Sequence, residues 1–351
     1  MTENMRRIIL FDQDLQPYRE GVYRFFSEEF RKLDYELIVL YDEKLNKRTI
    51  SNDNMQAWPY TFFGFAKALA KFEPEIIIQF VWLRYFFLFP FMLYSKFLGK
   101  KIILWSHGIN LQKRDQKLMN QLYYLRQRLA NTLIIYHEDQ LQYVVKNEDA
   151  VFIANNTLNF HEFPQITATK NELKEKYGFD GKKVLLCVGR MNMNNRKISH
   201  LIQLADRLDD NYQVVLVGPG VEPSEVKDSS LEYLGVEYDQ TTVNEYYKMA
   251  DVFVMPGAIG LAINQAFYHG LPVIIEDVYQ GPEGGYLKDS VNGYRYEQGN
   301  VTDLEKKVEL VLGNKAHYEL LSRNAKNTMN NEGSIEKMFD GFRNAVKHVS
   351  R

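Results

Sequence analysis

Two basic residues that follow a strand-like run have the chemistry to bind an anion. In VLLCVGRMNMNNRKISHLI, at 184–202, Gly189 and Arg190 come directly after an apolar run, and Lys197 stands at the start of the next helical pattern. Arginine offers a planar fork of donors, lysine a point charge, and the first amides of a helix are unpaired. This arrangement suits a diphosphate, and a solvated basic turn explains the same residues equally well.

Glycines mark two further places where the backbone can approach a ligand closely. Gly257 and Gly260 precede a helical pattern in MPGAIGLAINQAFYHG, at 255–270, so the amides that open this helix can also face a phosphate. Gly218 follows the apolar run of VVLVGPG, at 214–220. A short glycine motif alone is a weak indication, because tight turns need glycine for their own geometry.

Short apolar runs alternate with helical patterns along most of the chain. Runs that are apolar almost throughout predict strands buried on both faces, and therefore parallel sheets with crossover helices. Six runs lie in the first half, near 6–11, 36–41, 75–80, 101–105, 132–136 and 151–154. Four follow near 183–188, 213–217, 251–255 and 272–275, with helices predicted at 197–208 and 241–250. The sequence therefore predicts an α/β protein with two Rossmann-like domains.

A polar stretch at 162–182 separates the two sets of runs and is the best linker candidate. We predict one domain over 1–165 and a second over 166–333, followed by a C-terminal helix over 334–351. Further helices are predicted near 302–313, 315–329 and 334–349. Open α/β sheets bind ligands at the carboxyl ends of their strands, so the candidate residues should gather in a cleft between the domains.

Composition excludes several classes of function. The 351 residues are 45% hydrophobic and 25% charged, as in ordinary globular proteins. The 43 Lys and Arg residues and 45 Asp and Glu residues give a formal net charge of −2, which argues against nucleic acid as a partner. The single cysteine, Cys187, fits a reducing, cytoplasmic setting. Neither a signal-peptide core nor an apolar run of membrane-spanning length is legible.

Familiar catalytic motifs are also missing. The sequence has no legible Ser-His-Asp or Cys-His arrangement, no HExxH or EF-hand pattern and no GxxxxGK[ST], and its second half has no DxD pair. Because that half has no DxD pair to hold a divalent ion, Arg190, Lys197 and the helix amides would have to neutralise a diphosphate. We therefore expect no metal and no further cofactor beyond the donor substrate.

Taken in order, the motifs of the second half resemble the donor half of GT-B glycosyltransferases of family GT4. They are VGR, a following Lys, a glycine loop after VLVG, LGV, ADVFV, a Gly-x-x-Gly-Leu helix, a Gly-x-Pro-Val strand and Asn-Gly-Tyr, over about 184–300. The resemblance implies the GT-B fold, with an acceptor domain over 1–165 and a nucleotide-sugar donor domain over 166–333. It also implies that the C-terminal helix packs back on the N-terminal domain.

The resemblance assigns roles to individual residues. Those matching Arg190 and Lys197 hold the diphosphate, the stretch matching 234–236 borders the nucleobase, and the Gly-x-x-Gly-Leu helix covers the phosphates and donor sugar. The expected donor-binding residues are Gly21, Gly189, Gly218, Val236, Gly257, Gly260, Leu261, Asn264, Gln265 and Glu283; the expected catalytic residues are His107, Arg190 and Lys197.

This sequence departs from the family at two positions. Family members usually carry two glutamates eight positions apart, where this chain has Gly257 and Gln265. Glutamine can still bind a ribose diol, but hydrogen bonds to charged groups are roughly twice as strong. Glu283, in GPEGG, is a nearby carboxylate that can compensate. The departure leaves open a catalytically inert, nucleotide-binding partner subunit.

The first half supports the resemblance more loosely. In LWSHGIN, at 104–110, His107 follows a strand-like run, and related enzymes often have a histidine there that contacts the donor sugar. A lone histidine is more often structural. In YREGVYRFF, at 18–26, Glu20 and Gly21 follow the first strand, where GT-B enzymes have a loop near the acceptor and diphosphate. An ordinary helix start explains Glu20 at least as well.

Aromatic and basic residues are concentrated in one part of the first half. Nine of the eighteen residues at 80–97 are aromatic, and nine Lys or Arg residues stand against one acid, Asp115, between Arg84 and Arg128. Part of this run must be core, since it links two strands as a crossover helix. The bases favour an interfacial surface at the inner face of the cell membrane, with a lipid-linked saccharide as the acceptor.

The sequence thus predicts a retaining glycosyltransferase that moves a sugar from a nucleotide diphosphate sugar to a saccharide acceptor, in the synthesis of surface polysaccharide or glycolipid. Two alternatives remain: the inert partner subunit, and a nucleotide-sugar 2-epimerase, which shares the two-domain architecture. The nucleotide, the sugar and the acceptor are not legible from the sequence.

Overall fold

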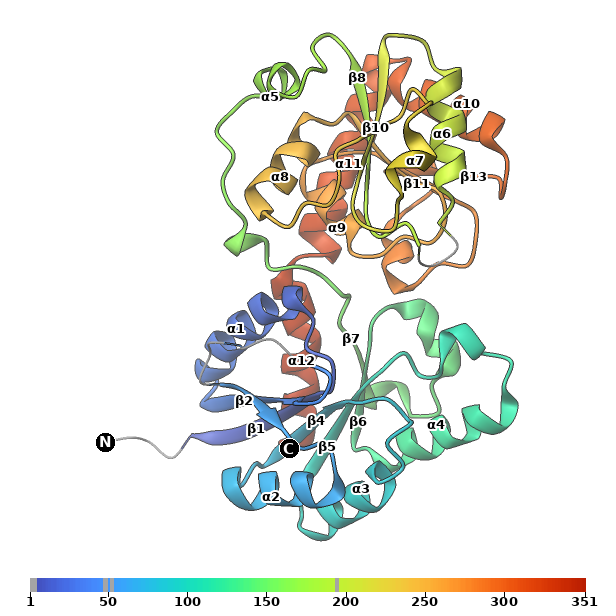
Figure 1. Cartoon of the computed structure of the whole chain (residues 1–351). Coiled ribbons are helices and arrows are strands. Elements are labelled where there is room, and N and C mark those ends of the chain that lie inside the picture. The colour runs from blue at the N-terminus through green and yellow to red at the C-terminus, as the bar shows by residue number, and fades with distance from the viewer. Residues whose placement is uncertain (1–4, 47–49, 51–53, 193–195) are drawn as a thin grey trace. The chain divides into compact units, whose positions relative to one another are not determined.

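The chain forms two compact units, each built around its own parallel sheet (Figure 1). The computed structural model describes residues 5–46, 50, 54–192 and 196–351, so part of the basic segment at 184–202, namely 193–195, lies outside the described residues. The first unit comprises Met1–Asn159 and Ile335–Arg351, and the second comprises Phe160–Ser334.

The sheet of the first unit has the order β3-β2-β1-β4-β5-β6-β7, with all neighbours parallel. The direction of chain travel reverses between β1 and β4, the switch point at which doubly wound sheets bind ligands. The strands are β1 (Arg6–Asp12), β2 (Tyr35–Asp42), β3 (Met55–Trp58), β4 (Ile76–Phe80), β5 (Lys101–Trp105), β6 (Thr132–Ile135) and β7 (Val151–Ile153).

Helices cover both faces of this sheet. Apolar side chains of α1 (Pro17–Arg31) and α12 (Ile335–Val349) share one core cluster, and those of α2 (Phe62–Phe72), α3 (Leu88–Phe97) and α4 (Lys117–Leu129) line the opposite face. The C-terminal helix therefore belongs to the first unit, as its red ribbon among the blue elements of Figure 1 shows. The ring of Phe26 lies 5.4 Å from that of Phe339 and 4.8 Å from that of Phe342.

The second unit repeats the design with the order β10-β9-β8-β11-β12-β13, again parallel, around one contiguous core. Its strands are β8 (Lys183–Val188), β9 (Tyr212–Val217), β10 (Glu232–Tyr233), β11 (Val252–Met255), β12 (Val273–Glu276) and β13 (Gly293–Tyr296). Its helices are α5 (Lys170–Lys176), α6 (Ile198–Arg207), α7 (Pro223–Val226), α8 (Gln240–Met249), α9 (Ala262–Tyr268), α10 (Val301–Leu312) and α11 (Lys315–Glu332).

All ten apolar runs are strands, which confirms the predicted fold class. The predicted helices at 197–208, 241–250, 302–313, 315–329 and 334–349 match α6, α8, α10, α11 and α12. The prediction missed β3, β10 and β13, with sequences MQAW, EY and GYRY. All three are edge strands, and none carries the continuous apolar run that marks a central parallel strand.

The boundary between the units lies six residues earlier than the sequence predicted, at Asn159/Phe160 instead of 165/166. Aromatic packing explains the difference. The ring of Phe160 stacks on that of Tyr268 in the second unit, with centroids 4.4 Å apart, and Phe163 contacts the same ring. Asn159 instead donates a hydrogen bond to the carbonyl of Gly21 in the first unit, at 3.1 Å. Polarity alone does not reveal these partners.

Candidate active site

The candidate residues of the second unit gather at the carboxyl edge of its sheet, around the switch point between β8 and β11. Gly189 follows β8 and Gly257 follows β11, with φ of +154° and +122°. Gly218, after β9, touches the first of these loops, because a Cβ atom on Gly218 would lie 2.3 Å from the carbonyl oxygen of Gly189. Glycine is required where these loops meet, at the edge where open α/β sheets bind ligands.

Lys197 directly precedes α6 and is paired with a buried carboxylate. Its Nζ atom lies 2.6 Å from Oε1 of Glu276, and the backbone N–H of Gly299 donates to the same oxygen at 2.8 Å. The side chain of Glu276 is fully buried, whereas that of Lys197 is 34% exposed. Because an ammonium has three N–H donors, Lys197 keeps donors for a phosphate oxygen while it is bound to Glu276.

Sequence reasoning missed Glu276 and offered Glu283 as the nearby carboxylate. The only signal in the sequence was a glutamate at the end of the apolar run PVIIE. Glutamate is rarely buried without a partner, so a glutamate in this position indicates a nearby cation. The Oε2 atom of Glu276 is buried and has no hydrogen-bond partner among the described residues. Glu283 lies in a short 3-10 helix, η5 (Pro282–Tyr286). Glu276 is the carboxylate that pairs with Lys197, and the expectation that Glu283 compensates for the missing glutamates stays a prediction.

Arg196 is a second residue that sequence reasoning missed, although it directly precedes Lys197. Its Nε–H donates to the carbonyl of Ala258 at 3.0 Å, and its Nη1–H donates to the carbonyl of Arg190 at 2.9 Å. The guanidinium thereby ties the loop after β8 to the loop after β11. Burial lowers the pKa of Arg196. Arg190 itself is exposed, so its side chain is accessible to a ligand at the same edge.

Helix α9 is short, and its polar side chains face different ways. The helix spans only seven residues and begins after Leu261; a Cβ atom on the preceding Gly260 would lie 4.0 Å from Nη2 of Arg196. Asn264 is fully buried and hydrogen-bonds Tyr286. The expectation that Asn264 contacts the donor is therefore corrected: its side chain faces the core, because the apolar stripe of so short a helix must bury most of its surface.

Gln265 is held by a neighbouring amide on α8. Its Nε2 donates to Oδ1 of Asn244 at 2.8 Å, and the Nδ2 of Asn244 donates in turn to the carbonyl of Pro164 at 3.2 Å. Since Oδ1 of Asn244 is an acceptor, the amide of Gln265 has one permitted orientation. Its Oε1 atom is therefore the group that can accept a hydrogen bond from a ligand hydroxyl. Asn244 had no signal in the sequence.

The stretch expected to border a nucleobase lies beside the loop after β9. The backbone N–H of Gly218 donates to the carbonyl of Gly235 at 2.8 Å, and the N–H of Leu234 donates to the carbonyl of Leu216 at 3.0 Å. Val236 follows and is 45% exposed. An exposed valine next to the glycine loop provides an apolar surface on which a flat ring can rest.

In the first unit, Gly21 lies inside a helix, not in a loop. It is buried in the second turn of α1, and its carbonyl accepts the hydrogen bond from Asn159. The residues that join β1 to α1 are 13–16. The expectation that Gly21 binds the donor is corrected, because its backbone is committed to the helix and to Asn159.

His107 follows β5 and is half-buried at the carboxyl edge of the first sheet. Its ring stacks on that of Tyr136, with centroids 4.4 Å apart, and its Nδ1 atom lies 2.9 Å from Nε2 of Gln140. Burial lowers the pKa of His107 to about 4, and the positive charge of Arg19 contributes in the same direction. His107 is therefore neutral at physiological pH.

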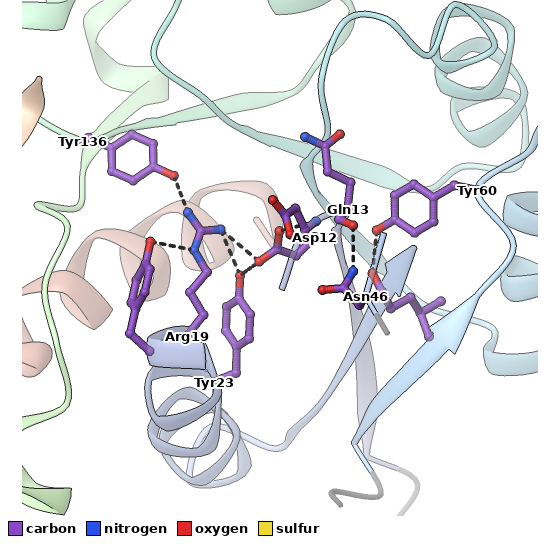
Figure 2. A network of polar contacts seen from close by, with 10 residues as sticks. Asp12, Gln13, Arg19, Tyr23, Asn46, Tyr60 and Tyr136 are labelled. Carbon is purple, nitrogen blue, oxygen red and sulfur yellow. Dashed lines mark hydrogen bonds and ion pairs between the residues drawn. The ribbon is translucent and has the colours of Figure 1, made fainter. Parts of the chain in front are cut away.

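A buried ion pair of Asp12 and Arg19 lies at the switch point of the first sheet and reaches Tyr136, the residue on which His107 stacks (Figure 2). The Nη1–H of Arg19 donates to Oδ2 of Asp12 at 2.9 Å, and the hydroxyl of Tyr23 donates to the same oxygen at 2.6 Å. Nη2 of Arg19 lies 3.3 Å from the hydroxyl oxygen of Tyr136. Burial raises the pKa of Asp12, and Arg19 opposes that rise. Sequence reasoning did not single out this pair.

The comparison with protein families agrees with this geometry. The family model of glycosyl transferases group 1 matches residues 169–328, which include β8 to β13 and the loops described above. The second unit is a group 1 glycosyl transferase domain. No match to a curated protein sequence was found.

Solved structures, several of them named as glycosyltransferases, resemble the whole chain. HepE (Alr3699) of Anabaena in complex with UDP has a TM-score of 0.77 at 12% identity, covering 98% of this chain and 100% of that chain. A glycosyltransferase of Rickettsia africae has a TM-score of 0.71 at 16% identity, covering 99% of each chain. The lipopolysaccharide outer core galactosyltransferase WaaB has a TM-score of 0.70 at 15% identity, covering 97% and 99%. With its group 1 domain and the GT-B fold, the chain is a glycosyltransferase.

Two searches of the described residues gave negative results. Within 5–46, 50, 54–192 and 196–351, no group of three or more His, Cys, Asp or Glu side chains is arranged to hold a metal ion. Over the same part of the chain, no helix has both the length and the apolar character needed to cross a membrane.

Proposed function

We propose that this glycosyltransferase moves a sugar, with retention of anomeric configuration, from a nucleotide diphosphate sugar to a saccharide acceptor. The observation that carries the proposal is the set of three basic residues, Arg190, Arg196 and Lys197, at the switch-point edge of the group 1 domain. The Anabaena HepE structures hold UDP and UDP-glucose. A uridine diphosphate sugar is therefore the first donor to test.

The geometry suggests how these residues lower the barrier. As the bond between the sugar C1 and the β-phosphate oxygen breaks, negative charge grows on that oxygen, and fixed cations nearby stabilise it. Lys197 is held by Glu276 and Arg196 by two carbonyls, so neither has to reorganise when the charge develops. In a front-face route the acceptor oxygen bonds to C1 while its proton passes to the departing phosphate oxygen. Such a route needs no protein nucleophile, in keeping with glycine at 257.

Transfer is expected to proceed in EDTA, because cations of the chain take the place of a divalent ion. The assay combines purified protein with UDP-glucose and a set of saccharide acceptors, with and without EDTA. The mass and the linkage of each product are then determined. Loss of transfer in EDTA with recovery on adding Mg²⁺ or Mn²⁺ would overturn metal independence.

Two other outcomes of the same assay would replace the proposal. An epimerised nucleotide sugar formed without any acceptor would identify a 2-epimerase. Calorimetric binding of UDP with no turnover on any acceptor would identify an inert partner subunit. The second outcome has specific support, since Gly257 lacks a carboxylate and Gln265 is neutral.

For the acceptor, we propose a lipid-linked saccharide reached at an anionic membrane surface. Four of the nine aromatic residues at 80–97 are exposed, namely Trp82, Phe86, Tyr94 and Phe97, and Leu118 on the neighbouring helix α4 is 85% exposed. Phe91 is fully buried, so the run serves both core and surface. We name the exposed residues of 82–118 the aromatic-basic surface. Its basic members are Arg84, Lys96, Lys101, Lys113, Arg114 and Lys117.

Flotation with anionic liposomes is expected to retain the protein at low salt and release it at high salt. Each basic residue near such a surface contributes roughly 1 kcal/mol. The triple variant Lys113→Glu, Arg114→Glu and Lys117→Glu should therefore partition at least a hundredfold more weakly.

A matched control reverses three exposed lysines of the second unit, Lys227, Lys306 and Lys315, and so changes the net charge by the same amount. Equal loss of binding in both triple variants would show a general charge effect and no specific surface. Equal recovery of the unmodified protein with neutral and anionic liposomes would contradict the membrane proposal.

A further inference from the structure

Three groups that follow β5 and β6 form a short hydrogen-bonded chain in the first unit. The backbone N–H of Tyr136 donates to Oε1 of Gln140 at 2.8 Å, and Nε2 of Gln140 lies 2.9 Å from Nδ1 of His107. Gln140 belongs to the 3-10 helix η2 (Glu138–Tyr143) and is only 3% exposed. The imidazole therefore makes two contacts. Its face stacks on the ring of Tyr136, and its Nδ1 atom meets the amide of Gln140.

This chain permits one arrangement of protons. A backbone N–H can only donate, so the atom of Gln140 that meets Tyr136 must be the carbonyl oxygen. Rotating the amide by half a turn would place two donors in contact. Nε2 of Gln140 must then donate to His107, and Nδ1 of His107 must carry a lone pair. The single proton of the neutral imidazole is consequently on Nε2.

The charged group that faces the imidazole opposes any second proton. Nη2 of Arg19, on α1, lies 3.3 Å from the hydroxyl oxygen of Tyr136, whose ring stacks on His107, and its partner Asp12 is fully buried. Protonating Nδ1 would set two N–H donors of His107 and Gln140 against each other. Burial and Arg19 both lower the pKa of His107, in agreement with this geometry.

No hydrogen bond reaches Nε2 of His107 from the part of the chain that the structure describes, and this atom is not among the fully buried polar atoms without a partner. We propose that Gln140 is a positioning residue that fixes His107 as a neutral imidazole with its proton on Nε2, so that His107 offers one N–H donor to an oxygen of a bound saccharide. The saccharide part of this inference rests on the proposed function; the proton arrangement does not.

As a consequence, Nε2 of His107 remains a neutral hydrogen-bond donor across the physiological pH range. A cationic histidine would attract any anion, whereas a neutral N–H selects an oxygen acceptor with defined direction. A sugar derivative without an oxygen at the contacted position would leave the N–H without a partner, which costs binding energy.

The test uses the full chain with ¹⁵N-labelled histidine and two-dimensional NMR of the ring nitrogens. The signals of His107 are assigned by comparison with His107→Gln. We expect an unprotonated Nδ1 and a protonated Nε2, unchanged between about pH 5.5 and 8. A proton on Nδ1, or a titration in that range, would overturn the proposal.

The variant Gln140→Glu tests directly whether Gln140 fixes the position of the proton on His107. The carboxylate still accepts from the N–H of Tyr136, so the local fold keeps its hydrogen bond, but its second oxygen now requires a donor at Nδ1 of His107. The proton should move to Nδ1 or the pKa of His107 should rise by at least one unit. Gln142→Glu is the matched control, because it adds the same charge two residues away on an exposed side chain. Identical His107 signals in Gln140→Glu and the unmodified protein would overturn the positioning role.

Transfer kinetics separate this inference from the proposed function. In an active enzyme, Gln140→Glu should make kcat/KM depend on pH between about pH 5.5 and 8. Gln142→Glu should show the same pH profile as the unmodified protein. If the NMR signals are as expected but the protein transfers no sugar, the positioning role of Gln140 stands. The proposal that His107 binds a saccharide would then be overturned.

Discussion

Replacing Lys197 by alanine is expected to lower kcat by roughly 10²–10³, the effect of removing one preorganised group that stabilises developing negative charge. Two causes act together. The β-phosphate oxygen loses a cation, and the carboxylate of Glu276, which is fully buried beside Lys197, loses its ion-pair partner. Initial rates at saturating UDP-glucose and acceptor measure the loss, and calorimetry with UDP measures the accompanying weakening of binding.

Three further variants make this result interpretable. Adding Glu276→Gln to Lys197→Ala removes the buried carboxyl that has lost its partner, so folding and part of the UDP affinity should return while kcat stays low. Lys183→Ala removes a lysine at the opposite, amino end of β8 and should leave kcat unchanged. Arg190→Ala should weaken turnover as Lys197→Ala does. Wild-type turnover in Arg190→Ala or Lys197→Ala would refute the assignment of these residues to the diphosphate.

Replacing Arg19 by methionine is expected to destabilise the first unit by about 3–5 kcal/mol, the usual effect of removing one partner of a buried ion pair. Asp12 would remain fully buried with only Tyr23 and a backbone amide as partners. All three tryptophans of the chain, Trp58, Trp82 and Trp105, lie in the first unit, so their fluorescence during urea unfolding reports on that unit alone.

The control for this prediction is an exposed ion pair of the same unit. Lys32, which pairs with Glu29, is 68% exposed, and Lys32→Met should change stability by less than about 1 kcal/mol. Adding Asp12→Asn to Arg19→Met should restore a large part of the lost stability, because no buried charge then remains. A loss below 1 kcal/mol in Arg19→Met would mean that the pair contributes no more than a surface contact.

The sequence by itself determined the layers of this fold and the loops that carry the candidate site. Runs such as KVLLCV and DVFVM became parallel strands, because a strand buried on both faces has to be apolar throughout. Gly189 and Gly218 were placed at strand ends and Gly257 before a helix, and the positive φ values of all three agree with tight loops there. These features depend on residues close together in the chain, which is why a local pattern predicts them.

Only the tertiary structure decided which side chains meet. Lys197 finds Glu276, 79 residues away, and His107 finds Gln140, 33 residues away, because crossover connections bring distant strand ends to one edge. The same packing turned Asn264 into the core, placed Gly21 inside a helix and joined Phe160 to the second unit. A hydrogen bond or a ring stack depends on distances of a few ångströms between elements, and the order of residues along the chain does not record those distances.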